Sequence, residues 1–466
     1  MKEKRSMKRF FTIFFTVLLS ATASAQLKTS YFMTGARMRM DMNPALAPRR
    51  GYVQIPVVGG MYFSKNSNFA SIDNLLYPHN GGLVTFMHGS VDADKFLRRL
   101  SKNNYIDVDT KIDLASVGNH ARRYFWNFDF GLRAIGGGNI PKDLFSFLKK
   151  TTSGTCDLGG MSFSTDMYLQ LGLGFAFPII ENKVEFGFKV KALLGLAQFR
   201  TEFDRLYINS SADKLSGSVR GRLVGNINAV DPVALLRDKD VRFKGIGNFG
   251  GAIDVGVNVR LLDDHLRVSA AVVDLGFVKW SDKHSVRSNA LNYDFEITGY
   301  DIDDDEFKIE STEDLDDIEW ETGKGYARRL STTLNIGAEY SILKDRISFG
   351  LLSSTKFAPS YTTSEVTLSA NFRPVEWFGC SLSNSFVNNK VGIFGIAFNF
   401  DASWINFFLG MDYVAFKYAK VYGYAVPLRG KSSNLYFGLA VPLRTHEKAV
   451  DSYRLKMARK ARKAAR

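Results

Sequence analysis

The longest regular pattern in the chain is an alternation of apolar and polar residues between positions 166 and 196. In its first half every second residue is apolar, in the order Met167, Leu169, Leu171, Leu173, Phe175 and Phe177. Successive side chains of a β-strand point to opposite faces of a sheet, so a period of two predicts a strand. The alternation resumes after residues 178–182. The stretch therefore predicts a β-hairpin.

Both strands of this hairpin are longer than those of ordinary soluble sheets. A soluble strand runs for about five or six residues, whereas a tilted strand that crosses a bilayer needs roughly 9–11. One face of the hairpin is apolar, and the other mixes charged residues, polar residues and glycine. That combination is typical of a barrel strand with lipid outside and an aqueous or filled interior.

The same alternation recurs along the chain and predicts fourteen strands. They cover residues 51–64, 104–115, 124–136, 161–177, 183–201, 248–262, 265–280, 329–341, 346–357, 361–374, 376–387, 390–400, 404–417 and 433–443. Short and long connections alternate between them, as periplasmic turns and extracellular loops do in outer-membrane barrels. Residues 215–227 also alternate, so an extra hairpin within 202–247 would give sixteen strands. We predict an all-β, transmembrane antiparallel barrel of about fourteen strands, with sixteen as the alternative.

A soluble β-sandwich is the competing fold. Its two sheets would need a contiguous apolar core between them. Here the face that would lie inside carries Asp, Glu, Lys, Arg or Gly on nearly every strand. This pattern favours the barrel.

The N-terminus has the features of a secretory signal peptide. Basic residues precede an apolar run at 10–19, and Ala23-Ser24-Ala25 supplies small residues at the cleavage positions. We predict a signal peptide at 1–25 that is cut after Ala25. The apolar run is shorter than the roughly 20 residues of a spanning helix. An exported chain of long alternating strands indicates the outer membrane of a Gram-negative-type cell.

The formal net charge of +14 does not indicate nucleic-acid binding. Most of the excess lies in the signal peptide and in the last fifteen residues, so the body of the chain has no broad basic surface. We divide the mature chain into a non-periodic segment at 26–50, a barrel at 51–443 and a basic periplasmic tail at 444–466. We expect outer-membrane lipid and lipopolysaccharide as surroundings and no nucleic-acid partner.

Taken together, the signal peptide, the Asn43-Pro44-Ala45 motif and about fourteen strands resemble the FadL/PorV-like outer-membrane barrels. Turn and strand phrases such as Asp274-Leu275-Gly276 are also similar to that family. The chain looks closest to an uncharacterised branch, a domain of unknown function. The resemblance implies that the 26–50 segment is a plug or hatch in the lumen and that the barrel binds or passes hydrophobic small molecules. A non-transporting scaffold or shuttle with envelope protein partners, as in PorV-like relatives, is the alternative.

Charged and polar side chains of the inward face form the first candidate site. They are Asp129, Arg133, Asp166, Glu185, Lys189, Lys191, Asp254, Arg260, Glu339 and Asp412. A charge-selective pore would need a constriction of one sign, whereas these residues carry both signs. We expect them to pair with one another and with the plug.

Apolar residues in two long loops form the second candidate site. They are Phe96, Leu97, Leu100, Leu144, Phe145, Phe147 and Leu148. They would form a groove for a hydrophobic ligand, or alternatively pack small helices onto the barrel rim.

We expect no enzymatic activity, no cofactor and no metal site. The six histidines lie in predicted loops, turns or the tail, and no nucleophile elbow or zinc-binding motif is present. A lipase that needs a single Ser/His pair is the alternative left open. The acidic stretch at 301–321 lacks the glycine and the distal glutamate of an EF-hand loop, so we interpret it as a surface loop.

Overall fold

The computed structural model describes residues 27–445, apart from 70, 80–81, 151–153, 212–213, 231–242, 289–290, 299–319, 344, 360, 388–389, 413–417, 422–423 and 428–432. The predicted signal peptide, nearly all of the basic tail and most of the acidic stretch lie outside these residues.

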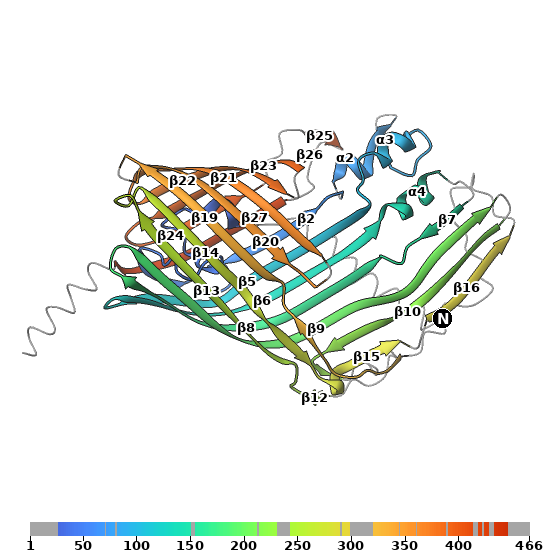
Figure 1. The fold of residues 1–466 in the computed structure, drawn as a ribbon, viewed down its shortest axis with the longest axis horizontal. Helices are drawn as coiled ribbons and strands as arrows, with labels where there is room; N and C mark the ends of the chain where they lie inside the picture. Colours follow the sequence, from blue (N-terminus) through green and yellow to red (C-terminus); the bar gives the residue numbers. More distant parts are fainter. Residues whose placement is uncertain are drawn as a thin grey trace, which may run out of the picture.

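The architecture is a closed antiparallel β-barrel (Figure 1). In the described residues its wall has fourteen strand positions: β1 (Arg50–Gln54) with β2 (Met61–Ser67), β5 (Asn103–Ala121), β6 (Tyr124–Pro141), β8 (Ser162–Ile180), β9 (Val184–Ser211), β13 (Phe249–Leu261), β14 (Leu266–Trp280), β19 (Thr332–Ile342), β20 (Ile347–Phe357), β21 (Thr362–Val375), β22 (Phe378–Val387), β23 (Lys390–Asp401), β24 (Asn406–Met411) and β27 (Ser433–Thr445). β27 pairs with β1 and β2 and closes the ring. The predicted fold class and the count of fourteen are confirmed.

The alternation in the sequence separates the two faces of the wall. In β8, Leu171 and Leu173 are both 46% exposed on the outer face. Gln170, which directly precedes Leu171, is 4% exposed on the inner face. A strand has two faces, so one parity fills the interior and the other meets the surroundings. The outer surface of the barrel is apolar as a result.

The first wall strand differs from the continuous strand predicted at 51–64. It is interrupted after β1, because residues 55–58 leave the ladder and are exposed on the outer surface. Val57 has a φ of 66°, a conformation that β-branched residues rarely adopt. Leu439 nevertheless donates its backbone N–H to the carbonyl of Gly59, so the ring stays closed across the bulge.

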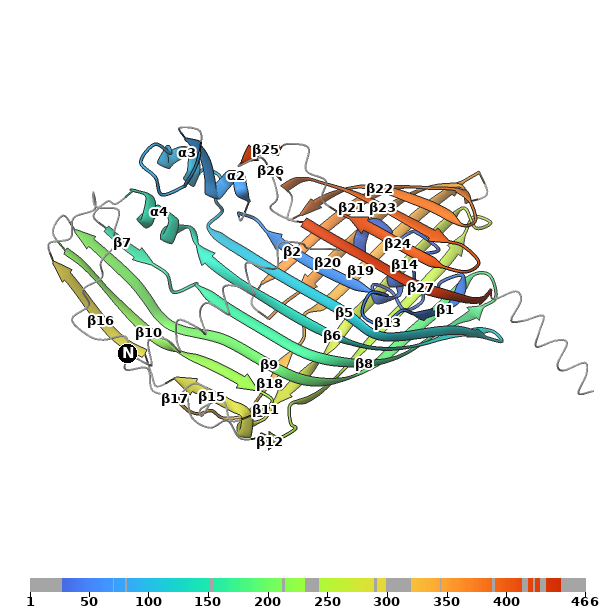
Figure 2. The same ribbon diagram turned by 180° about the vertical axis from the view of Figure 1, so that it is seen from behind.

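The predicted alternation at 215–227 is a strand, but it does not enlarge the barrel. β10 (Lys214–Ile227) pairs with the second half of β9, residues 197–211, which we call its upper part. β13 pairs with the first half, residues 184–194, which we call its lower part. β10 also pairs with β15 (Ser285–Ser288) and β16 (Leu291–Thr298). Figures 1 and 2 show these strands as an extension of the wall beyond one side of the rim.

The long connections lie at the end of the barrel that carries this extension. They contain α2 (Ile72–Leu75), β3 (Leu76–His79), β4 (Gly82–Thr85), α3 (Ala93–Leu97), α4 (Lys142–Lys150), β7 (Gly154–Asp157), β11 (Ala229–Val230), β12 (Phe243–Gly245), η3 (Asp282–His284), β17 (Trp320–Thr322), β18 (Tyr326–Arg329), β25 (Tyr418–Val421) and β26 (Tyr424–Pro427). We call this end the loop end and the opposite one the turn end. The turn end carries the short connections that the sequence predicts. Among the described residues, no helix has the length and apolar character needed to cross a membrane.

A closed ladder of this size predicts heat-modifiable mobility in electrophoresis. Opening a barrel breaks hydrogen bonds along a whole strand pair, so the folded chain should resist dodecyl sulfate at room temperature and unfold on boiling. We expect two different mobilities for unboiled and boiled samples. One mobility for both samples would contradict a closed barrel.

Candidate functional site

Residues 27–49 lie inside the barrel near its turn end, where Figure 2 shows them in blue and enclosed by the wall strands. We call them the N-terminal segment. It contains two short 3-10 helices, η1 (Leu27–Ser30) and η2 (Arg37–Asp41). Most of its apolar side chains, including Tyr31 and Met42, pack in one buried cluster with Leu352 and Phe408 of the wall, and Met40 packs in a second one. Whether the segment also blocks passage, as a plug would, stays a prediction.

The Asn43-Pro44-Ala45 motif is a tight turn that presses on the wall. The Asn43 side chain accepts a hydrogen bond from the backbone N–H of Ala45 at 2.9 Å, and its amide donates to the carbonyl of Val257 at 3.3 Å. Gly187 of β9 and Gly256 of β13 are register partners directly beneath this turn.

These two glycines have no room for a side chain. A Cβ atom on Gly256 would lie 2.1 Å from the Asn43 side-chain oxygen, and one on Gly187 would lie 2.2 Å from the Pro44 carbonyl carbon. Both distances are shorter than any real contact. The motif and the glycine pair are therefore one docking feature, made by residues more than 140 positions apart.

A belt of paired charges surrounds Asp41 at the end of η2. The Asp41 carboxylate accepts from Lys111 of β5 at 2.7 Å and lies 3.5 Å from the ammonium of Lys189 of β9. Each lysine has a second acidic partner, Asp113 at 3.2 Å and Asp129 at 2.5 Å respectively. A buried charge is tolerated only when it is paired and hydrogen-bonded, and the segment supplies one of the acids in this network.

The belt continues around the wall on both sides of Asp41. Lys191 lies 2.7 Å from Asp254 and 2.5 Å from Asp274. Arg133 lies 2.8 Å from Asp109 and 3.4 Å from Asp274. Both signs therefore alternate around the inner wall, and they compensate one another locally.

The start of the segment is held by the opposite wall. Lys28 pairs with Glu365 of β21, and the Thr29 hydroxyl hydrogen-bonds with Asp412. The Thr29 and Ser383 hydroxyl oxygens are 2.6 Å apart. The segment thus spans the lumen from β9 and β13 to β21 and β22.

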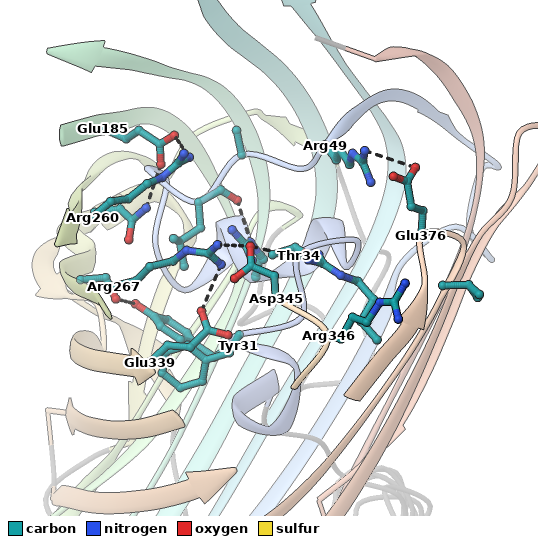
Figure 3. A pocket seen from close by; sticks show the side chains of 18 of the residues that line it. Tyr31, Thr34, Arg49, Glu185, Arg260, Arg267, Glu339, Asp345, Arg346 and Glu376 are labelled. Carbon is teal, nitrogen blue, oxygen red and sulfur yellow. Dashed lines mark hydrogen bonds and ion pairs between the residues drawn. The ribbon is translucent and has the colours of Figure 1, made fainter. Parts of the chain in front are cut away.

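A cavity of about 880 Å³ lies at the turn end, between the segment and the wall (Figure 3). We call it the vestibule. Its charged lining residues are Arg39, Arg49, Glu185, Arg260, Arg267, Glu339, Asp345, Arg346, Arg373 and Glu376. Arginine is its only kind of cation among the lining residues.

The structure places all ten predicted inward polar residues in buried or half-buried positions, most of them in ion pairs. Their partners are Lys189 for Asp129, Asp109 for Arg133, Arg328 for Asp166, Arg260 for Glu185, Asp254 for Lys191, Arg267 for Glu339 and Thr29 for Asp412. They do not form one site. One group lies in the belt, another in the vestibule, and Asp166 and Asp412 lie apart from both.

Sequence reasoning missed several members of these clusters. Asp274 escaped it because its φ of 58° shifts the inward parity by one residue at a bulge in β14. Arg39 and Asp41 lie in a segment without a regular apolar–polar period, so alternation does not predict which way their side chains point. Lys356, which pairs with Asp107 at 3.1 Å, continues the inward parity of β20 and could have been found from it.

The predicted loop residues are packed against one another in two clusters. Phe96, Leu97, Leu100 and Phe145 join Phe69 in the first cluster, and Leu144 and Phe147 pack on Cys156 and Leu206 in the second. Leu148 is 37% exposed. This packing agrees with the alternative, in which small helices pack onto the barrel rim. A ligand groove at these residues stays a prediction.

One family model matches residues 44–412, and its description is "Family of unknown function (DUF5723)". The chain belongs to this family. No curated protein matches it.

Several solved barrels are similar to the chain at low identity. The toluene transporter TodX of Pseudomonas putida is 10% identical, with a TM-score of 0.37, over 87% of this chain and 92% of TodX. A FadL homologue of Pseudomonas aeruginosa is 9% identical, with a TM-score of 0.39, over 90% and 98%. The monoaromatic hydrocarbon channel CymD is 10% identical, with a TM-score of 0.39, over 89% and 94%. Values this low carry no inference about ligand or mechanism.

Adding one methyl group beneath the motif should undock the N-terminal segment. We expect Gly256→Ala to weaken docking by about 1–3 kcal/mol, because the new Cβ overlaps the Asn43 side chain. Faster amide hydrogen exchange in residues 36–46, measured by mass spectrometry, would report this. Gly251→Ala, in the same strand, is the control, since its Cβ would meet only the Lys191 carbonyl oxygen at 3.5 Å. Equal exchange in the two variants would contradict the docking feature.

The contribution of Asp41 to docking of the segment should weaken in acid. Burial alone would raise the pKa of Asp41, but the ammonium groups of Lys111 and Lys189 outweigh it and hold that pKa below the ordinary 3.8. A carboxyl whose pKa is lowered on docking contributes stability above the undocked pKa and loses it as the pH falls toward the docked pKa. We therefore expect the contribution of Asp41 to docking to be constant from pH 8 to 5 and to fall below about pH 4.

A spin label on Ala47→Cys, with Cys156 and Cys380 replaced by serine, would report segment mobility across this range. Asp41→Asn should weaken docking at neutral pH and reduce the acid dependence. Asp92→Asn removes the same charge from the cap of α3, outside the lumen, and should behave as the parent. An acid dependence that is unchanged in Asp41→Asn would refute the assignment.

Proposed function

We propose that this protein is an outer-membrane β-barrel that binds or passes hydrophobic small molecules, with the N-terminal segment as its gate. The turn end would face the periplasm and the loop end the exterior. The apolar outer face of the wall supports insertion in a bilayer, since lipid-exposed strands carry such a band.

The observation that carries the gate is the way the segment is held. Among the described residues, none of 27–49 forms a β-ladder with a wall strand. Its contacts are packed side chains, hydrogen bonds and ion pairs such as Asp41 with Lys111. The segment can therefore leave without breaking the hydrogen-bonded ring, which stays closed through β27 and β1.

The interior argues against a porin for small ions. A charge-selective pore concentrates one sign at its constriction. Here each belt cation has an acidic partner, as Lys189 has Asp129 and Lys191 has Asp254. Paired charges of this kind do not select solutes by the sign of their charge, and a neutral solute would pass beside an undocked segment. The resemblance of the sequence to FadL/PorV-like barrels also favours a hydrophobic solute.

The extension at the loop end favours a second candidate, an envelope scaffold or shuttle. β9 continues past the point where β13 leaves it, and β10 and β16 widen the sheet there. These strands do not help to close the ring, but they provide a broad surface for a protein partner.

Locking the segment to the wall should abolish passage. In a chain with Cys156→Ser and Cys380→Ser, we expect Thr29→Cys with Ser383→Cys to form a disulfide, because the native hydroxyl oxygens are 2.6 Å apart. Uptake of a fluorescent hydrophobic probe into proteoliposomes should fall to background in the oxidised protein and return on reduction. Deletion of residues 27–49 should raise uptake above that of the parent.

The single variant Thr29→Cys is the control for the lock and should show no response to oxidant. Equal uptake by the oxidised and reduced double variant would refute gating by the segment. If uptake also stays at background after the deletion, and a second envelope protein co-purifies in stoichiometric amount from mild detergent, the scaffold explains the protein better.

A further inference from the structure

The vestibule holds more positive than negative charge. Six arginines and four carboxylates line it. Three of the four carboxylates have a close arginine partner: Arg260 lies 2.5 Å from Glu185, Arg267 lies 2.6 Å from Asp345, and Arg49 lies 3.3 Å from Glu376. Figure 3 shows several of these pairs around one hollow.

Two more contacts complete the pairing. Glu339, the fourth carboxylate, lies 3.4 Å from Arg267 and accepts from Ser348. Arg373 lies 3.8 Å from Asp345 and donates to Thr34. Every carboxylate of the vestibule is thus engaged, and the charges of Arg39 and Arg346 are left over.

Arg39 is buried, with 9% of its surface exposed, and its guanidinium lines the vestibule. Its Nε donates to the Leu46 carbonyl at 3.2 Å. Among the described residues, neither of its two terminal nitrogens has a hydrogen-bond or ion-pair partner, and Glu339 and Glu185 act on it only through space. Burial lowers the pKa of Arg39 to about 10, so it stays charged at neutral pH.

The two terminal nitrogens of Arg39 keep free N–H groups, and an anion in the vestibule would accept charge-assisted hydrogen bonds from them. Arginine offers a planar fork that matches phosphate or carboxylate oxygens in a bidentate way. Arg346 belongs to the turn between β19 and β20 and lines the same cavity from the wall side. Arg346 is exposed to solvent, and together the two charges left over equal the charge of one dianion.

We propose that the vestibule binds a phosphate group, held between Arg39 of the N-terminal segment and Arg346 of the wall. A phosphate monoester carries close to two negative charges at neutral pH. The bound group would link the segment to the wall and stabilise the docked position, because a ligand that binds one state shifts the equilibrium toward it. This proposal does not depend on the passage of hydrophobic molecules.

The cavity is larger than the phosphate group alone requires. Its volume of about 880 Å³ falls in the range of sites for whole organic ligands. Phe32, Leu46 and Val375 line it beside the arginines and would contact an apolar remainder. A soluble phosphate monoester and a lipid with a terminal phosphate share this chemistry.

Inorganic phosphate is the first probe, titrated by calorimetry into the full chain in an uncharged detergent. We expect saturable binding of one phosphate per chain. Arg39→Gln and Arg346→Gln should each weaken it by about ten-fold or more, since each removes charge-assisted hydrogen bonds. Arg205→Gln removes the same charge from an exposed position in the upper part of β9 and should leave binding unchanged.

Arg39→Gln alone could act by loosening the segment, so Arg346→Gln separates the two effects. The second probe is the protection of residues 36–46 from hydrogen exchange in vesicles of phosphatidylcholine with or without phosphatidic acid. Protection by phosphatidic acid alone supports a lipid source, and protection by inorganic phosphate supports a soluble one. The proposal is overturned if neither probe binds or protects, or if both arginine variants respond like Arg205→Gln.

Discussion

Pairing of charge inside a closed wall is the constraint on which the rest of this structure depends. A barrel of fourteen strands encloses a space that fourteen rows of inward side chains must fill or leave wet. Here those rows carry lysine, arginine and aspartate at the middle of the wall, and buried charges persist only with partners. Asp41 of the N-terminal segment is one of those partners. The position of the segment and the ion pairs of the belt therefore depend on each other.

The shape of the N-terminal segment follows from its contacts with the wall. Because it makes no ladder with the wall, its backbone turns through 3-10 helices and the Asn43-Pro44-Ala45 turn, and its own side chains satisfy part of its backbone. Close approach is possible where the wall has no side chain, at Gly187 and Gly256 beneath the motif and at Gly350 and Gly395 beside Phe32 and Thr29. The glycine pair, with Lys189 beside it on β9 and Lys111 on β5, places the segment in a single orientation. The same orientation brings the buried Arg39 to the vestibule.

In this arrangement, binding of an anion in the vestibule and gating of the barrel would be coupled through the N-terminal segment. The docked segment carries Asp41 toward the belt and Arg39 toward the vestibule, so any anion held by Arg39 adds to the contacts that keep the segment in place. Under the proposed function, passage of a solute would need the opposite movement. A barrel built in this way can keep its wall rigid while the equilibrium of one short, non-ladder segment responds to what the turn end binds.

Alternation along the chain was enough to predict the barrel, the number of its strands, the turn end and most inward charges, because side-chain parity in a strand is a local property with a period of two. It could not place what depends on contacts between distant residues. Whether residues 214–227 widen the ring or extend β9 was decided by the register of β13 on β9. Asp274 was hidden by a bulge, and the first strand is interrupted at residues 55–58. The partners of Arg39 and Asp41 exist only in the folded chain, since a segment without a period meets the wall wherever charge and free space allow it.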